Sequence, residues 1–437
     1  MGNSDIIRGV MMIKTLSVLI MLLLGDNSIQ SLVDEACLLS GGPSISVGII
    51  KDDYPFYYNC GYSDVDEQIM ASPDTLYELA SVSKSFTASG ILKLEEQGML
   101  NMSDSIQEYL PNLNMNSITL NHFLYHTSGI TNEDHMYLIK EQDTLKKTVD
   151  NLNSIDLAFL VGERFQYGTL NYDVLGRVIE VVSGQSFESY MENEVFKPLC
   201  LTHTTLNNDK LAQGYKSSFL IMSPYDAPTY DGNKPAGYVI SNVKDMVKWM
   251  RIQIDTPHIA DRTVDPVDGF YYGDGWSISE DNSMIEHSGV NPTFSSQVVL
   301  YPKEKIGITV LSNSAHVNNM NLAMGIKDIL DGNPKPSYER SLLQLSDWLF
   351  TAVTVLSILL IIFHKRFSKI FEKHFYFLLI VTLILIGGSI YFPRFIGHTW
   401  TSLLVWQPLS LVIALISLTI LSTVLTVHAY PKNEEEQ

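Results

Sequence analysis

A serine and a lysine stand three positions apart at the start of a predicted helix, in the segment Ala80-Ser81-Val82-Ser83-Lys84. Positions i and i+3 of a helix are neighbours on one face, so the Ser81 hydroxyl and the Lys84 amine are expected to touch. A serine hydroxyl is a weak nucleophile until a base removes its proton, and a lysine becomes such a base when desolvation lowers its pKa. Free N–H groups at the helix N-terminus would face an oxyanion formed on the substrate. The segment therefore predicts covalent acyl transfer.

The S-x-x-K pattern has low specificity when it stands alone. It is short enough to arise by chance, and it recurs in this chain at Ser241-Asn242-Val243-Lys244. For an isolated match, a surface serine beside a solvated lysine is the simpler interpretation. The choice of Ser81 therefore depends on the residues that follow it.

Further short motifs follow Ser81 in order along the chain. The two that carry functional groups are Tyr167-Gly168-Thr169 and His287-Ser288-Gly289. Other short segments precede, separate or follow these two motifs along the chain: Phe123–Gly129 (FLYHTSG), Asn171–Gly176 (NYDVLG), Lys197–Leu199, Pro235–Gly237, Gly273–Trp276 and Val310–Asn313. The ordered set is far more specific than the S-x-x-K tetrad.

From about residue 41 to residue 315 the sequence resembles the serine beta-lactamase-like hydrolases, which include class C beta-lactamases, DD-peptidases, D-aminopeptidases and esterases. The resemblance implies that Ser81 is the nucleophile and that Lys84 is its base partner. It implies that Tyr167 acts as a base together with Lys84 and transfers a proton to the leaving group. It places the oxyanion hole at the backbone N–H groups of Ser81 and Val290, where two donors can lower the barrier by several kcal/mol. It implies no metal and no organic cofactor.

Two positions depart from the family pattern. The resemblance assigns substrate binding to Thr169 and to His287, Ser288 and Gly289. The family usually has asparagine where Thr169 stands, and threonine offers a hydroxyl in place of an amide. His287 replaces a lysine found in many members, which removes a permanent cation that would hold a substrate carboxylate. Both changes point away from a dedicated beta-lactamase and toward esterase, aminopeptidase or specialised amidase activity.

Other residues that fit a motif have structural alternatives. Tyr167 is one of 22 tyrosines and would also suit a packed core, and His287 would suit the end of a strand. His126, in the HTSG segment, is interpreted as shaping a loop. Tyr57-Tyr58-Asn59 fits Y-x-N by spacing, but it precedes Ser81 in a predicted strand and is assigned to core packing.

The elements that must position these groups can be read from hydrophobic periodicity. Strands are predicted at 45–51 and 57–62, joined by a DDYP turn, and again at 276–279, 295–301 and 306–312. Helices are predicted at 81–97, at 172–183 with a stop at Gly184, and at 187–195. Strands are thus predicted at both ends of residues 31–337, with helices between them. This order predicts an α/β fold, in which an antiparallel sheet formed by both ends of that segment is flanked by helices and carries a helical subdomain.

Composition narrows the class of protein. The chain has 437 residues and a net charge of -19, so broad nucleic-acid binding is excluded as a function. Charged residues make up only 18% and hydrophobic residues 46%, which excludes a largely disordered chain. The three cysteines form no CxxC motif or Cys/His cluster, so no zinc site is predicted. A single bridge such as Cys37–Cys60 and a fully unpaired set both fit the sequence.

The apolar excess lies in three C-terminal runs, at about 345–363, 375–392 and 402–429, each close to the length that crosses a bilayer. Buried core helices are the alternative to membrane spans, but three runs in succession separated by short polar loops favour spans. The loop between the first two runs carries Lys365, Arg366, Lys369 and Lys373 against Glu372, which places it in the cytoplasm. Everything before the first run is then extracytoplasmic, and the lipid bilayer is a partner.

The remaining boundaries follow from this topology. Residues 1–30 contain Arg8 and Lys14 before an apolar run at 16–24, which fits a cleaved signal peptide or an uncleaved N-terminal anchor. Residues 31–337 form the predicted extracytoplasmic hydrolase domain, 344–430 the membrane helices and 431–437 a cytoplasmic tail. The protein is thus expected in the cell membrane as a multi-pass protein.

A hydrolase domain followed by three membrane helices also resembles the prodrug-activating peptidases of nonribosomal peptide pathways. The resemblance implies cleavage of an amide bond next to a D-amino acid, either in a secreted N-acylated peptide or in cell-wall peptide. A carboxylesterase or D-alanyl esterase using the same residues is one alternative. A sensor that is acylated at Ser81 and never released is another, although the short tail offers no output domain.

Overall fold

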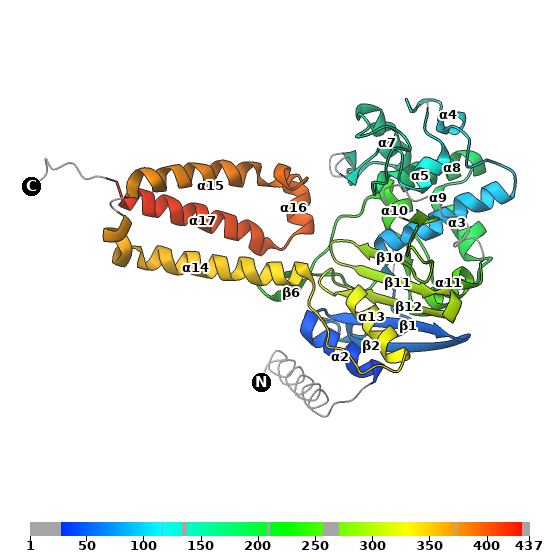
Figure 1. Ribbon diagram of the computed structural model, residues 1–437, viewed down its shortest axis with the longest axis horizontal. Helices are drawn as coiled ribbons and strands as arrows, with labels where there is room; N and C mark the ends of the chain where they lie inside the picture. The colour runs from blue at the N-terminus through cyan, green and yellow to red at the C-terminus, as the bar shows by residue number, and fades with distance from the viewer. Residues whose placement is uncertain are drawn as a thin grey trace, which may run out of the picture. The chain divides into compact units, whose positions relative to one another are not determined.

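The computed structural model describes residues 28–115, 117–132, 138–207, 210–256, 271–371 and 374–430. Contacts divide the chain into two compact units (Figure 1). The first takes in the described residues up to Tyr215 and Pro224–Arg340, and the second consists of Lys216–Ser223 together with the residues from Ser341 onward. The predicted signal segment, apart from residues 28–30, and the predicted tail at 431–437 lie outside the described residues.

An eight-stranded antiparallel sheet forms the centre of the first unit, in the order β3-β2-β1-β12-β11-β10-β9-β8. Both ends of this unit's sequence meet in it, because β1 pairs with β12 in a register that sets Ile45 opposite Ser312. The predicted fold class is therefore confirmed. The strands of this sheet are β1 (Ser44–Lys51), β2 (Tyr54–Asp64), β3 (Ile69–Met70), β8 (Tyr272–Gly273), β9 (Trp276–Ile278), β10 (Ile285–Val290), β11 (Ser295–Tyr301) and β12 (Ile306–Ser312). Four short strands form two separate pairs, β4 (Tyr77–Glu78) with β7 (Ile240–Ser241), and β5 (Tyr215–Ser218) with β6 (Ile221–Pro224).

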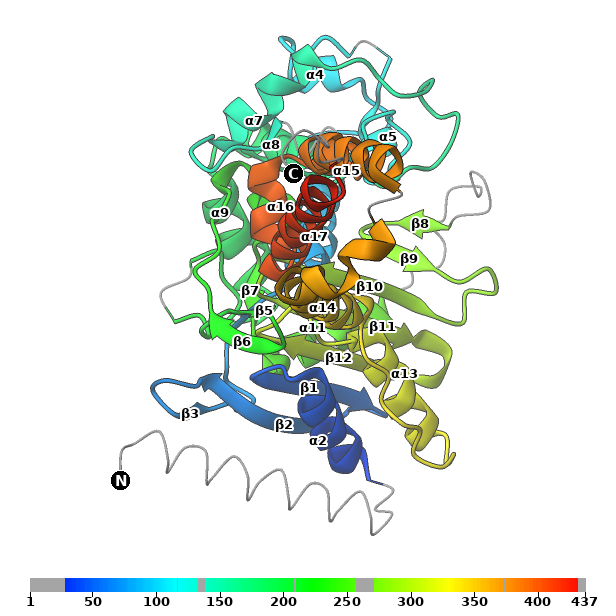
Figure 2. The same ribbon diagram turned by 90° about the vertical axis from the view of Figure 1, so that its left-hand side faces the viewer.

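Helices cover both faces of the sheet (Figure 2). Alternate residues of a strand point to opposite faces, so Val298 and Leu300 join one apolar core while Val299 and Tyr301 join the other. The first core extends into the helical subdomain, and the second lies under α2 and α13. The helices of this unit are α2 (Ile29–Ser40), α3 (Ser83–Glu96), α4 (Ile106–Tyr109), α5 (Leu120–Leu124), α7 (Leu145–Asn151), α8 (Leu170–Ser183), α9 (Phe187–Tyr190), α10 (Lys234–Gly237), α11 (Val243–Asp255) and α13 (Asn319–Leu330), and a π-helical segment, Met191–Phe196, extends α9.

One disulfide ties the second core together. Cys37 on α2 is bonded to Cys60 on β2, whereas Cys200 is free and exposed. Of the two arrangements that fit the sequence, the structure has the bridged one. A covalent link between the first helix and an outer strand limits the unfolded states open to this end of the chain.

Several predicted boundaries were wrong. The turn between the first two strands is shorter than DDYP, because Tyr54 and Pro55 already pair with β1. Ser81 does not begin the helix but lies in a 3-10 turn, η1 (Ala80–Val82), in which Val82 N–H donates to Leu79 C=O. The helix predicted from Tyr172 begins two residues earlier, and β10 was not predicted from periodicity.

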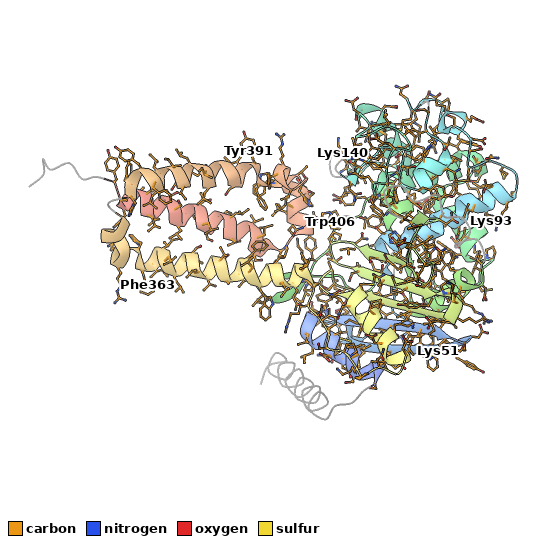
Figure 3. The ribbon with its side chains drawn as sticks, viewed as in Figure 1. Lys51, Lys93, Lys140, Phe363, Tyr391 and Trp406 are labelled. Carbon is orange, nitrogen blue, oxygen red and sulfur yellow. A yellow bond between two sulfur atoms is a disulfide. The ribbon has the colours of Figure 1, made fainter. Side chains whose placement is uncertain are left out.

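Among the described residues, three helices are long and apolar enough to cross a membrane: α14 (Leu342–Phe371), of which 342–366 qualifies, α15 (Phe375–Phe395) and α17 (Leu409–His428). The third predicted run, 402–429, is not one helix. It breaks between α16 (Trp400–Trp406) and α17, because Pro408 has no N–H to continue the hydrogen-bond ladder. Helix α14 also extends beyond the predicted 345–363 into the basic segment. Within the helical bundle, Phe363 and Trp406 lie at opposite ends (Figure 3).

Candidate active site

The serine singled out by sequence lies in a tight turn held against the sheet. Ala80, the residue before Ser81, has a φ of +47°, which is uncommon for a residue with a side chain. Strand β10 approaches this turn closely at Gly289, where a Cβ atom would lie 2.2 Å from the carbonyl oxygen of Leu79. Only glycine fits at this position, which explains the last residue of the His287-Ser288-Gly289 motif in physical terms.

Lys84 lies next to Ser81 and is fully buried. Its Nζ donates to Ser81 Oγ at 3.1 Å and to the carbonyl oxygen of Ala236 at 2.9 Å. Burial lowers the pKa of Lys84 to about 7, and the Asp173 carboxylate opposes that change. A substantial fraction of the amine is therefore neutral near pH 7 and able to accept the Ser81 proton.

Asp173 is the buried acid on α8 behind this lysine, and the sequence analysis did not single it out. Its Oδ2 accepts from Asn233 Nδ2 at 2.7 Å, and the backbone N–H of Ala236 also donates to the carboxylate. The carbonyl of the same Ala236 accepts from Lys84, so the short helix α10 joins the acid to the amine. Burial raises the pKa of Asp173, and Lys84 opposes the rise. Each of these two fully buried groups thus influences the charge state of the other.

Tyr167 completes the group around Ser81. The Lys84 amine lies 5.0 Å from the centre of the Tyr167 ring, and the ring packs against His126 at 4.4 Å between centroids. Burial raises the pKa of the Tyr167 hydroxyl, an effect that the nearby Ser81 hydroxyl opposes. Among the described residues, this buried hydroxyl makes no hydrogen bond of standard geometry. Tyr167 is therefore a neutral phenol, suited to donate a proton.

His126 supports Tyr167 from behind, as its structural interpretation implies. Its Nδ1 accepts from the backbone N–H of Gly168 at 3.3 Å and lies 3.1 Å from the Asn171 amide nitrogen. Burial lowers the pKa of His126 well below its usual range. A neutral imidazole held at Nδ1 by these two groups keeps the Tyr167-Gly168-Thr169 turn in place.

Thr169 stands at the N-terminus of α8 and is tied to Asn132. The Thr169 hydroxyl and backbone N–H both bond to Asn132 Oδ1, at 3.1 Å and 3.0 Å. The threonine hydroxyl is thus engaged within the protein. Asn132, which sequence reasoning did not identify, places an amide side chain in contact with this position.

The third motif lies on β10. His287 is buried, with Nδ1 donating to the carbonyl oxygen of Ser288 at 2.7 Å and Nε2 lying 3.1 Å from the Tyr272 hydroxyl. Burial lowers the pKa of His287 to about 3, so it carries no charge at neutral pH. Ser288 and Val290 are on the exposed side of the strand, and Ser288 Oγ donates to Gln297. The structure therefore places the motif beside Tyr167. Both ring nitrogens of His287, however, bond to other groups of the protein.

A second buried acid, Glu78, was also missed by sequence reasoning. Its Oε2 accepts from Asn291 Nδ2 at 2.6 Å, and the same amide donates to the Gly237 carbonyl at 3.0 Å. Burial raises the pKa of Glu78 to about 7. Glu78 precedes Ser81 by three residues and Asn291 follows Val290, so the pair braces the two segments that carry the predicted oxyanion donors. No periodic pattern signals such a pair.

The second S-x-x-K match is not a site. Ser241 Oγ is buried and bonded to Thr204, whereas Lys244 is paired at 2.7 Å with Asp74 on the surface. Within the part of the chain that the structure describes, no group of three or more His, Cys, Asp or Glu side chains could hold a metal ion. Of the two matches, only Ser81–Lys84 joins a hydroxyl to a desolvated amine.

Comparisons with known proteins show which family and fold the chain resembles. A family model described as "Beta-lactamase" matches residues 33–330. Protein flp of Staphylococcus aureus (strain MRSA252) is 31% identical over 358 residues, covering 75% of this chain and 70% of that protein. Penicillin-binding protein 4* of Bacillus subtilis (strain 168) is 26% identical over 328 residues, covering 66% and 72%. The octameric penicillin-binding protein homologue from Pyrococcus abyssi matches in structure with a TM-score of 0.63 at 27% identity, covering 71% of this chain and 78% of that one.

Proposed function

The chain belongs to the beta-lactamase family and is a serine hydrolase of that fold, and we propose that Ser81 is its nucleophile, Lys84 its base and Tyr167 its proton donor. The observation that carries the proposal is the 3.1 Å contact between the half-buried Ser81 Oγ and the Nζ of the fully buried Lys84. A lysine whose pKa is about 7 is matched to general-base catalysis near neutral pH.

The reaction runs in two acyl-transfer steps. Neutral Lys84 takes the Ser81 proton as Oγ bonds to the substrate carbonyl carbon, and the negative charge moves to the carbonyl oxygen. The backbone N–H groups of Ser81 and Val290 receive that oxyanion. Tyr167 gives its proton to the leaving amine or alcohol as the bond to it breaks, and Lys84 restores the phenol proton. Water then attacks the acyl-enzyme by the reverse proton path and releases the acid.

We propose an amide bond next to a D-amino acid as the substrate, in a secreted N-acylated peptide or in cell-wall peptide. Two relatives carry the name penicillin-binding protein or homologue, which supports a peptide-like substrate. His287 is neutral and internally bonded, and this disfavours a substrate held by a carboxylate at that position. Thr169 lies at the N-terminus of α8, and Ser288 and Gly289 lie on β10. We assign these three residues to substrate binding.

We propose that the protein is anchored in the cell membrane with the hydrolase domain, residues 31–337, outside the cytoplasm. The support is the presence of three helices of sufficient length and hydropathy within residues 342–428, which overlap the predicted membrane region at 344–430. Lys365 and Arg366 lie near the end of α14, and the positive-inside rule places that end in the cytoplasm. Residues 1–30 then act as a signal peptide or anchor, and 431–437 form a cytoplasmic tail. Anchoring would hold the enzyme in the same layer as a lipid-like acyl chain of its substrate.

The experiment that tests the function is product release by purified, detergent-solubilised, full-length protein. The substrates are N-acyl-D-amino-acid amides, their L counterparts, D-alanyl esters and a chromogenic cephalosporin. We expect turnover of the D-amides that is lost in Ser81→Ala and kept in Ser241→Ala. Turnover of D-alanyl esters alone would favour the esterase alternative. Stable acylation without product release would favour the sensor.

A further inference from the structure

Eight residues that precede the membrane helices by more than 100 positions belong to the same compact unit as those helices. The segment is Lys216–Ser223, which contains most of the β5–β6 hairpin. Three consecutive residues at its start, Lys216, Ser217 and Ser218, bond to three different apolar helices. Figure 1 shows β6 beside the N-terminal end of α14. The hairpin is therefore built into the helical bundle.

The hairpin satisfies backbone groups that are exposed by the break between α16 and α17. Lys216 Nζ donates to the carbonyl oxygens of Leu404 and Val405, at 2.5 Å and 2.9 Å, in the last turn of α16. Ser218 Oγ accepts from the backbone N–H of Leu409 at 3.0 Å, where α17 begins without a side-chain cap from Pro408. No water is available in hydrocarbon to satisfy such groups, so a helix break near the membrane needs these partners.

A buried carboxylate on α14 binds the same hairpin. Asp347 is 1% exposed and accepts from Ser217 Oγ at 2.6 Å and from the backbone N–H groups of Phe219 and Leu220, at 3.1 Å and 3.0 Å. Ser410 Oγ on α17 also donates to the carboxylate, at 2.5 Å from Oδ1. An acid in an apolar helix is costly unless its oxygens are satisfied, and here four donors surround it.

The turn that Asp347 binds has an unfavourable backbone for its sequence. Phe219 and Leu220 have φ values of +55° and +64°. Two-residue hairpin turns with positive φ at both positions ordinarily use Asn and Gly, because bulky side chains are strained there. Leu220 and the next residue, Ile221, are nevertheless 51% and 65% exposed. A water-facing turn gains nothing from strained, exposed apolar residues, whereas a turn that enters lipid does.

Aromatic residues at the same end of the bundle indicate the level of the membrane surface. Trp348 follows Asp347 and is 47% exposed, and Trp400 on α16 is 40% exposed. Trp406 lies at this end, opposite Phe363 (Figure 3). Tryptophan is enriched where headgroups meet acyl chains. The hairpin tip, which we define as Phe219–Ile221, thus belongs to the boundary region of the bilayer.

We propose that the β5–β6 hairpin is a second membrane attachment, in which the hairpin tip inserts between the headgroups and acyl chains of the outer leaflet and Asp347 holds the turn in the inserting conformation. This inference rests on the membrane anchoring given under the proposed function. It means that the hydrolase domain is held at two points along its sequence, at the hairpin and at the start of α14.

The test places an environment-sensitive NBD fluorophore at single cysteines in the full-length protein, in vesicles of phosphatidylglycerol and phosphatidylethanolamine with or without nitroxide-labelled lipids. The background is Cys200→Ser, because Cys200 is the free, exposed thiol. The tip variants are Leu220→Cys and Ile221→Cys. Leu356→Cys, on an exposed face of α14, is the membrane control, and Leu160→Cys, 77% exposed in the hydrolase domain, is the water control.

We expect lipid nitroxides to quench the two tip probes about as strongly as the 356 probe, with shallow nitroxides more effective at the tip, and to leave the 160 probe unchanged. Quenching at 356 without quenching at 220 and 221 would overturn the hairpin proposal and leave the anchoring intact. A blue-shifted tip probe that lipids do not quench would mean that protein, such as a second copy of the chain, covers the tip, which also overturns it. No quenching at 356 would refute the anchoring and the hairpin proposal together.

The role of Asp347 is tested by Asp347→Asn in the Leu220→Cys background, with Ser346→Ala as the matched control. Ser346 precedes Asp347 on α14, but its hydroxyl donates to Leu343 within the same helix. We expect the asparagine variant to lose quenching at 220 and the alanine variant to keep it. Full quenching in Asp347→Asn would show that the carboxylate does not hold the turn.

Discussion

The acylation rate of Ser81 should depend on pH through the protonation state of Lys84. Burial lowers the Lys84 pKa from 10.5 to about 7, which makes the neutral amine roughly 1,600-fold more abundant at pH 7 than it would be in water. The base must be unprotonated to act. The rate of labelling by a fluorophosphonate should therefore fall about tenfold per pH unit below roughly pH 7 and level off above it.

The matched variants are Lys84→Arg and Lys244→Arg. An arginine stays charged at every accessible pH, so Lys84→Arg should lose the acid limb and about 10²- to 10⁴-fold in rate. Lys244, which belongs to the second S-x-x-K match and pairs with Asp74, should tolerate arginine. Asp173→Asn should move the acid limb to lower pH, because the Asp173 charge raises the Lys84 pKa. An acid limb near pH 10 in the unmodified protein, or full labelling of Lys84→Arg, would refute this reasoning.

Tyr167→Phe should slow amide hydrolysis about 10²- to 10⁴-fold but slow the hydrolysis of activated aryl esters much less, since their leaving groups need no proton; equal losses in steady-state kinetics would contradict this role. Gly289→Ala should lower the melting temperature and abolish labelling, because its Cβ would lie 2.2 Å from a carbonyl oxygen; an unaltered melting curve would be inconsistent with that contact. Lys84→Met should raise the melting temperature. Because the folded-state pKa of Lys84 lies below 10.5, the buried cation destabilises the fold fully below about pH 7 and no longer does so above about pH 10.5. The gain in melting temperature from Lys84→Met should shrink across that pH range, and a constant gain would argue against a buried cation at Lys84. Reduction of Cys37–Cys60, which are 23 residues apart, should cost about 3 kcal/mol of unfolding free energy, and denaturant titration with and without reductant measures it.

Much of the fold was predictable because strong periodic signals coincide with real elements. The short runs at 295–301 and 306–312, which are rich in β-branched residues and leucine, match β11 and β12 to the residue, and Gly184 ends α8 in a left-handed conformation. Boundaries failed where tertiary contacts decide them. The 3-10 turn at Ser81 depends on Ala80 and on the approach of β10, which no local pattern encodes. The break before α17 follows from Pro408, whose effect on an apolar run was underestimated.

The residues of the candidate site were likewise predictable only in part. Short motifs with fixed spacing located Ser81, Lys84 and Tyr167, and the structure brings these three together. Glu78 and Asp173 escaped notice because a buried acid has no sequence signature. Each acts through partners distant in sequence, Asn291 and Asn233, 213 and 60 residues away. Such pairs become visible only when the chain is folded.

The most direct test of the central claim is to map the covalent adduct. The full-length protein is reacted with a fluorophosphonate near pH 8, digested, and its modified peptide sequenced by mass spectrometry, alongside Ser81→Ala and Ser241→Ala. The account predicts one adduct on the Ser81 hydroxyl, unchanged in Ser241→Ala and absent in Ser81→Ala. An adduct on any other serine, or undiminished labelling of Ser81→Ala, would contradict it.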